Sequence, residues 1–215
     1  MTTPATLARR RDQASVDLYW IPLGAGGNVV RRSGRLFESL SARRARRPRC
    51  DLYHAALEVT VPGERYVIEL TPAWGNGRGD RGVVSKGPVG LRWLGRSRLF
   101  RYEVRRWRDG VVPDLAYAVG GRHRLSDDPR QARLVLDLAP AFPVATWGRD
   151  ELGTGDMWNS NSLVAWLLTR AGVDTDRAGL PPSGRAPGWS AGLVVAGRES
   201  TDHRRSRGNA RRGLR

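Results

Sequence analysis

Cysteine, histidine and lysine are scarce in this chain of 215 residues. Cys50 is the only cysteine, which excludes an internal disulfide and a cysteine-rich zinc site. Only three histidines are present, so few ligands exist for a metal centre, and we expect neither a metal nor a cofactor. Of the 37 basic residues only Lys86 is a lysine, an arginine bias typical of a GC-rich genome.

Long hydrophobic runs are also missing. No stretch approaches the roughly 18 apolar residues of a membrane span, and no apolar run follows the N-terminal arginines as in a secretory signal. We therefore expect a cytoplasmic protein without a transmembrane segment. Hydrophobic residues make up 40% of the chain, which fits a globular domain with a substantial core. The expected organisation is a disordered leader (1–14), a single domain (15–197) and a basic disordered tail (198–215).

The formal net charge of +16 is concentrated in two segments. Arg31–Arg49 holds eight arginines against Glu38, a net charge of +7. Arg198–Arg215 holds seven arginines against two acidic residues, a net charge of +5. Such runs are usually solvated, but they can bind nucleic acid or an anionic surface weakly through counterion release. No zinc-finger, helix-turn-helix or ribonucleoprotein motif accompanies them.

Local patterns predict an α+β domain, an antiparallel sheet of four to six strands packed with helices. The clearest element is a hairpin of 52–59 and 65–71, because Pro62 presets φ in the turn and Gly63 accepts a positive φ. Facing residue numbers in this hairpin sum to about 125, as counted from its turn. Further strands are expected at 16–23, 87–91, 99–107 and 193–196, and helices at 29–40, 125–138 (with Ser126 as N-cap) and 163–171.

The most informative segment is Asp156-Met157-Trp158-Asn159-Ser160-Asn161-Ser162, which places two Asn and two Ser at the start of the most apolar helix. A helix N-terminus has free N–H groups and a positive dipole end, so it stabilises an oxygen nucleophile or an oxyanion. About a hundred residues earlier, His54 lies within a predicted strand. In the hairpin register Glu69 is its diagonal neighbour on the same face, placed to orient the imidazole. A nucleophile, a base and an orienting acid are the parts of covalent hydrolysis.

This order resembles the circularly permuted papain-like hydrolases, related to the NlpC/P60 peptidases, the LRAT-type acyltransferases and the PPPDE peptidases. In those families a histidine on an early strand, as in Tyr53-His54-Ala55-Ala56-Leu57-Glu58-Val59, precedes an Asn-Cys-Asn/Glu-His-Phe-like motif at a helix start. Asn159-Ser160-Asn161-Ser162-Leu163 is similar, with Ser160 in the place of the cysteine, and bacterial families with an Asn-Ser-Asn-Ser/Thr motif look closer still. The resemblance covers roughly residues 50 to 172 and implies a circularly permuted papain-like fold.

The resemblance implies a hydrolase or acyltransferase acting on an amide or ester bond of a small molecule, peptide or lipid. Ser160 would be the nucleophile and His54 the general base. Glu69 would orient His54, and Asn159 or nearby N–H groups would stabilise the oxyanion. A serine needs a well-placed base more than a thiol does, so this is either a working Ser/His site or a degraded one.

Two other functional interpretations stay open. The run Asn159–Ser162 is also what a helix cap requires, and His54 is also what a structural histidine on a strand looks like. If these residues have only such structural roles, the chain is a non-catalytic peptide, lipid or polyanion binding protein of the same fold. As a further alternative it binds nucleic acid without sequence specificity through Arg31–Arg49 and Arg198–Arg215.

Overall fold

The computed structural model describes residues 13–24, 38–39, 41–44, 46–73, 82–112 and 114–212, with side chains up to Thr201. Most of the expected leader (1–14) and of the expected helix at 29–40 lies outside these residues. Within the described part of the chain, no helix has both the length and the apolar character needed to cross a membrane.

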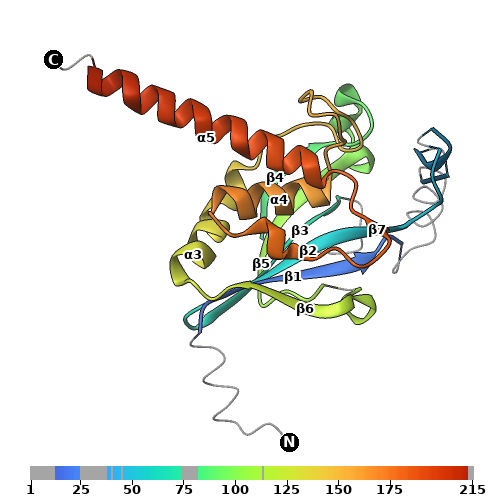
Figure 1. Ribbon diagram of the computed structural model, residues 1–215, viewed down its shortest axis with the longest axis horizontal. Helices are drawn as coiled ribbons and strands as arrows, with labels where there is room; N and C mark the ends of the chain where they lie inside the picture. Colours follow the sequence, from blue (N-terminus) through green and yellow to red (C-terminus); the bar gives the residue numbers. More distant parts are fainter. Residues whose placement is uncertain are drawn as a thin grey trace, which may run out of the picture.

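A seven-stranded sheet forms the centre of the domain (Figure 1). Six strands lie in the order β4-β5-β3-β2-β1-β6, each antiparallel to its neighbours, and β7 pairs in parallel with β2. The strands are β1 (Ser15–Pro22), β2 (Asp51–Val61), β3 (Glu64–Pro72), β4 (Val83–Pro88), β5 (Arg101–Arg108), β6 (Val119–Ser126) and β7 (Gly184–Arg185). The predicted mixed class with an antiparallel sheet is confirmed, and the two-residue β7 brings the strand count one above the expected range.

The hairpin of β2 and β3 has the predicted register. Val61 pairs with Glu64 and Leu57 with Ile68, so facing residue numbers sum to 125. Gly63 in the turn has a φ of +77°, a conformation that glycine adopts without a steric penalty. The register matters because it decides which side chains of β2 point to which face of the sheet.

Helices cover one face of the sheet (Figure 1). They are α3 (Pro129–Leu138), α4 (Ser160–Arg170) and α5 (Trp189–Arg212). α4 packs on β2 and β3 and is covered in turn by α5. Alternate residues of β2, from Tyr53 to Val61, point into the main core that these helices close, together with Trp158 and most of α4.

The last helix, α5, replaces a strand expected from the sequence. The prediction of a strand at 193–196 is wrong, because this segment lies inside α5. A run of four apolar residues fits either structure, and burial of Ala191, Val195 and Ala196 at helical spacing against the core selects the helix. α5 continues to Arg212, through most of the segment expected as a basic tail, and Figure 1 shows it extending beyond the rest of the domain.

The opposite face of the sheet carries a smaller apolar cluster of Tyr19, Ile21, Ala56, Val67 and Val112. The short 3-10 helix η3 (Leu115–Tyr117) begins beside Asp114, and its residue Leu115 packs against this cluster. The even-numbered residues of β2 point to this face, since Ala56 belongs to the smaller cluster and Ala55 to the main core. The two faces are therefore separate environments, one under helices and one under a loop.

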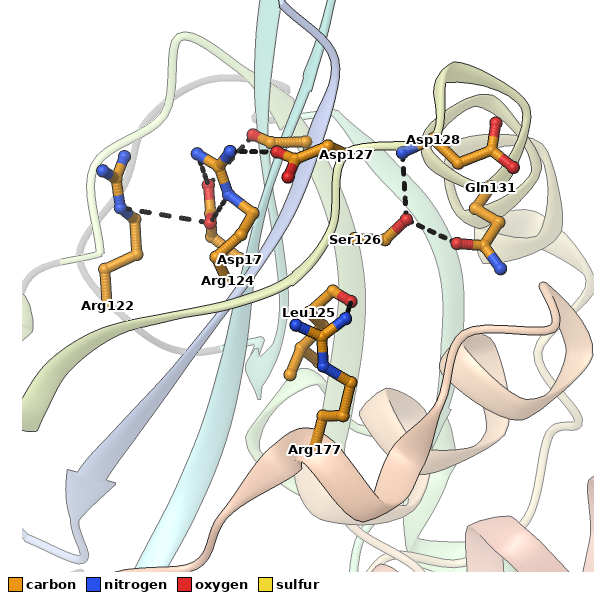
Figure 2. A network of polar contacts seen from close by, with 10 residues as sticks. Asp17, Arg122, Arg124, Leu125, Ser126, Asp127, Asp128, Gln131 and Arg177 are labelled. Carbon is orange, nitrogen blue, oxygen red and sulfur yellow. Dashed lines mark hydrogen bonds and ion pairs between the residues drawn. The ribbon is translucent and has the colours of Figure 1, made fainter.

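A charged network attaches the edge strand β6 (Figure 2). The Arg124 Nε donates to Oδ1 of Asp17 on β1 over 2.5 Å, and the same guanidinium also pairs with Asp127. Arg122 lies 4.0 Å from the same Asp17 oxygen. Asp17 is only 1% exposed, so it depends on these cations and on the Ser15 hydroxyl for compensation of its charge.

The start of α3 differs from the sequence expectation by two residues. Asp128, and not Ser126, is the N-cap, since its carboxylate accepts the N–H of Arg130 over 2.8 Å. Pro129 occupies the first helical position, where a missing N–H is harmless. The Ser126 hydroxyl instead accepts the N–H of Asp128 and contacts Gln131, as Figure 2 shows.

Candidate functional site

Asn159 and Ser162 form a capping box at the start of α4. The Asn159 Oδ1 accepts the N–H groups of Asn161 (2.9 Å) and Ser162 (3.3 Å), and the Ser162 Oγ accepts the N–H of Asn159 (3.1 Å). This reciprocal arrangement satisfies donors that a helix otherwise leaves unpaired. The capping interpretation of the Asn/Ser run therefore describes what these two side chains do.

The capping box uses the donors that an oxyanion hole requires. An oxyanion hole needs N–H groups free to point at developing charge, but those of Asn159, Asn161 and Ser162 point at side-chain oxygens within the motif. The Asn159 amide nitrogen donates to the carbonyl of Pro187 over 2.8 Å. Asn159 lies at the helix start as predicted, but it is committed to the cap and to the loop that contains Pro187.

Asn161 connects α4 to the backbone of β2. Its Oδ1 accepts the N–H of Ala55 over 2.8 Å, and its Nδ2 donates to the carbonyls of Tyr53 (3.0 Å) and Pro187 (2.8 Å). The pairing of β2 with β3 ends at Leu57, so Asn161 occupies the hydrogen-bonding edge that β3 has left. Asn161 is 2% exposed, which makes these bonds expensive to lose.

Asp156 extends this junction to α5. One of its carboxylate oxygens accepts the N–H of Gly188 and the hydroxyl of Ser190, both over 2.7 Å. A Cβ on Gly188 would lie 2.3 Å from the Asn159 Oδ1, which shows how closely the loop approaches the cap. The segment 156–162 thus holds together β2, α4 and the chain leading into α5, and we name it the junction segment.

Ser160, the predicted nucleophile, is the first residue of α4 and is 8% exposed. The Ser160 hydroxyl takes no part in the side-chain hydrogen bonds of the junction segment, which involve Asp156, Trp158, Asn159, Asn161 and Ser162. It is the one small polar side chain of the Asn/Ser run that neither the cap nor the bonds of Asn161 to β2 explain.

His54, the predicted base, lies on the other side of the sheet. It stands opposite Ile21 of β1 and points to the smaller apolar cluster, while its neighbours Tyr53 and Ala55 point into the core below α4. Burial lowers the pKa of His54, and the charge of Asp114, in the loop on that same face, acts in the opposite direction. The sheet separates His54 from the start of α4, so the structure does not bring the predicted catalytic pair together.

Glu69, the predicted orienting acid, shares the face of His54, since Val67 two residues earlier belongs to the smaller cluster. It stands opposite Arg105 of β5, and an Oε1 to guanidinium distance of 3.8 Å joins them. Arg105 also pairs with Glu103 over 2.8 Å. Glu69 is thus part of an ionic cluster between β3 and β5.

Cationic side chains gather at a different place, around β4. A pocket of about 410 Å³ is lined by Lys86, Arg92, Arg96 and Arg101, together with Gly87, Pro88, Gly95 and Val144. We call this the basic pocket. The guanidinium of Arg101 is held by the carbonyls of Gly95 (2.5 Å) and Arg96 (2.7 Å), which fixes one wall of the pocket. A pocket lined by four cationic residues favours an anionic ligand.

Large apolar side chains stand exposed on the segment that forms this pocket. The segment contains the 3-10 helices η1 (Arg92–Arg96) and η2 (Arg98–Phe100). Its exposed members, which we call the apolar rim, are Leu91 (42% exposed), Trp93 (69%), Leu99 (65%) and Phe100 (40%). Exposed apolar side chains that lie close together on a surface mark a site of interaction with a partner.

The base of the segment is fixed to the domain. The N–H of Val89 donates to the carbonyl of Phe100 over 2.8 Å, and the N–H of Gly90 to that of Trp147 over 3.1 Å. The Arg149 Nε donates to the carbonyl of Gly90 over 2.8 Å. The segment is therefore a structured protrusion, which Figure 1 shows beside the loop that precedes α4.

The sequence held a signal for this site that charge counting over longer segments did not find. Between Lys86 and Arg101 there are five cations, at positions 86, 92, 96, 98 and 101, and no acidic residue. Their alternation with Leu, Trp and Phe distinguishes this segment from the two arginine runs. Of those runs, Arg47 is paired with the buried Glu38 over 2.6 Å, and Arg198 donates to the carbonyls of Leu152 and Gly153.

No match was found in comparisons with protein-family models, curated proteins and solved structures. In the ranges that the structure describes, no three His, Cys, Asp or Glu side chains are grouped so that they could hold a metal ion. The function is therefore inferred from the geometry of the chain itself.

Proposed function

We propose that this protein is a non-catalytic binding protein and that the basic pocket binds an anionic ligand. The observation that carries the proposal is that four cationic residues, Lys86, Arg92, Arg96 and Arg101, line one pocket of about 410 Å³. Lys86 has an acidic neighbour, Glu103, at 3.8 Å. Arg92 and Arg96 are exposed, and neither forms an ion pair with a carboxylate within 4.0 Å among the described residues. Their charge is thus available to a ligand.

The proposal includes a circularly permuted papain-like fold whose hydrolytic site is no longer assembled. Its support is the chain order of a histidine-bearing strand followed by an Asn/Ser helix start, with Asn161 of α4 bonded to β2 beside His54. The position of His54 on the far face, and the use of Asn159 as a cap, favour binding over hydrolysis.

Isothermal titration of the full chain with inorganic tripolyphosphate tests the proposal. We expect Arg92→Ala/Arg96→Ala to weaken binding about tenfold, since two partly screened ion contacts contribute about 1.4 kcal/mol together. The affinity should fall with added salt, and less steeply in the variant. The matched control is Arg130→Ala/Arg133→Ala, which removes two exposed arginines from α3. Equal effects of both double variants would show that only net charge matters and would refute the assigned pocket.

Acyl transfer through Ser160 is the second candidate function. One observation favours it: the hydroxyl stands at a helix N-terminus and takes no part in the capping hydrogen bonds. Such an activity would need a base other than His54, because His54 points to the other face. Labelling by a fluorophosphonate probe that disappears in Ser160→Ala but persists in His54→Gln would establish it, and unlabelled folded protein would exclude it.

A further inference from the structure

The apolar rim and the basic pocket occupy one short segment, 86–101, and this combination identifies a class of partner. We propose that this segment docks the protein onto a membrane surface containing anionic lipid. Trp93, Leu99 and Phe100 enter the interfacial region, and the basic pocket takes a lipid phosphate group. This inference rests on the proposed function, because it names the source of the anion bound there.

The apolar rim supplies the first argument. Trp93 and Leu99 have 69% and 65% of their surface exposed, and Val144, which lines the basic pocket, has 54%. Tryptophan prefers the headgroup level of a bilayer, and leucine and phenylalanine prefer the acyl boundary below it. The rim therefore offers side chains suited to both depths.

Charge complementarity supplies the second argument. Arg92, Arg96 and Arg98 are exposed and interleave with the rim residues along η1 and η2. Two acidic groups of the described chain lie near these cations, and both have other partners: Glu103 is 3.8 Å from Lys86 but pairs more closely with Arg105 over 2.8 Å. Glu151 feels the charge of Arg92, and its carboxylate accepts the N–H of Thr146 over 2.9 Å. Cations beside exposed apolar residues match a surface whose phosphates lie above hydrocarbon.

The aliphatic members of the rim favour a lipid surface over a nucleic acid. Single-stranded nucleic acid binds by stacking bases on aromatic rings within a basic groove. Trp93 and Phe100 have such rings, but Leu91 and Leu99 have no face on which a base can stack, and they are 42% and 65% exposed. Hydrocarbon is the environment in which all four lose contact with water favourably.

The rigid base of the segment supplies the third argument. The backbone bonds from Val89 to Phe100 and from Gly90 to Trp147 hold η1 and η2 in place before any partner arrives. Tyr102 at the start of β5 is fully buried, and its hydroxyl donates to the carbonyl of Ala145 over 3.0 Å. The rim is thus presented by a structured element, so docking does not require ordering of the chain.

Flotation of the full chain with vesicles tests the inference. Vesicles of phosphatidylcholine alone are compared with vesicles in which about a third of the lipid is phosphatidylglycerol, at physiological salt. We expect binding only to the second kind. Trp93→Ala/Leu99→Ala keeps every charge and should weaken vesicle binding at least about tenfold, as loss of two interfacial side chains implies. Arg92→Ala/Arg96→Ala should weaken it by about fivefold for each arginine removed.

The controls separate this inference from the proposed function. Leu134→Ala/Leu180→Ala removes two leucines that are exposed elsewhere and should leave vesicle binding unchanged. Tripolyphosphate binding should be kept in Trp93→Ala/Leu99→Ala, which also shows that this variant is folded. The membrane assignment would be overturned if Trp93→Ala/Leu99→Ala and Leu134→Ala/Leu180→Ala weakened vesicle binding equally, or if neither weakened it.

The remaining outcomes are equally decisive. Binding of tripolyphosphate through Arg92 and Arg96 without binding of vesicles would overturn the membrane inference and leave the proposed function standing. Absence of both would overturn both. If the protein bound single-stranded DNA but not vesicles, and the Trp93 substitution abolished DNA binding, the partner would be a nucleic acid instead.

Discussion

The side chain of Asn161 forms hydrogen bonds with the backbone of β2 at Ala55, as a neighbouring β-strand would. Its amide oxygen accepts the Ala55 N–H over 2.8 Å, and its amide nitrogen donates to the carbonyl two residues earlier in the chain, that of Tyr53. One side chain thus satisfies a donor and an acceptor of β2 beyond the point where β3 stops pairing at Leu57. A helix start and a sheet edge are joined by a single residue.

The first prediction concerns this residue. Asn161→Ala should lower the free energy of unfolding by roughly 2 to 4 kcal/mol, because buried backbone groups of β2 lose their partners. Ser160→Ala, its neighbour, should change it by less than about 0.5 kcal/mol, since the hydroxyl takes no part in the capping bonds. Urea denaturation measures both. A large effect of Ser160→Ala would reveal a structural role that its geometry does not indicate.

A second prediction concerns pH. Burial lowers the pKa of His54 from its ordinary value of 6.5, so the unfolded chain takes up a proton at higher pH than the folded one. Stability should therefore fall as pH decreases below about 6.5, by at most about 1.4 kcal/mol per pH unit for one group. His54→Gln should flatten the stability curve between pH values of about 7 and about 5.5. The slope is measured from urea midpoints, and an unchanged slope in the variant would contradict the lowered pKa of His54.

A third prediction concerns the network of Figure 2. Arg124→Ala leaves Asp17, which is 1% exposed, without its nearest cation. Because Arg124 is itself 36% exposed and Arg122 remains nearby, we expect a loss of about 1 to 3 kcal/mol, below the cost of breaking a fully buried pair. A double-mutant cycle with Asp17→Asn isolates the coupling. The losses of unfolding free energy in the two single variants should not add up to the loss in the double variant. Simple additivity would show that the two side chains act independently.

A fourth prediction compares two glycines with positive φ. Gly63 has a φ of +77°, and a Cβ added there would meet nothing within 4 Å, so Gly63→Ala should cost only the conformational term of about 1 to 2 kcal/mol. Gly188 has a φ of +89° and would place its Cβ 2.3 Å from the Asn159 Oδ1. Gly188→Ala should therefore cost clearly more, because it also disrupts the cap of α4. Thermal unfolding measures the loss of stability in both variants. Equal shifts of Tm would argue against the tight contact between Gly188 and Asn159.

The hairpin was predictable because its turn is specified locally. Two turn residues, Pro62 and Gly63, fix the count of residues between the strands, and the count fixes every pair. The cap of α3 was missed by two residues because Ser126 and Asp128 are both good N-caps, and only Pro129 in the first helical position decides between them.

The separation of His54 from Ser160 follows from a pattern that was also present in the sequence. On β2 the uninterrupted apolar face is that of Tyr53, Ala55 and Leu57, whereas His54 alternates with them. An apolar helix such as α4 packs on the apolar face, which leaves His54 on the far side. The basic pocket was harder to predict from the sequence. It forms only where β4, η1 and β5 come together in the tertiary structure.

The junction segment determines when, during synthesis of the chain, the edge of β2 can be covered. The edge of β2 at Tyr53 and Ala55 is closed by Asn161, and Asn161 is itself held by the carbonyl of Pro187. A ribosome has to add more than a hundred residues after Ala55 before this edge can be covered, since Asn161 lies 106 positions further along the chain. During that interval the sheet presents open backbone to other chains, the condition under which strands pair wrongly and aggregate.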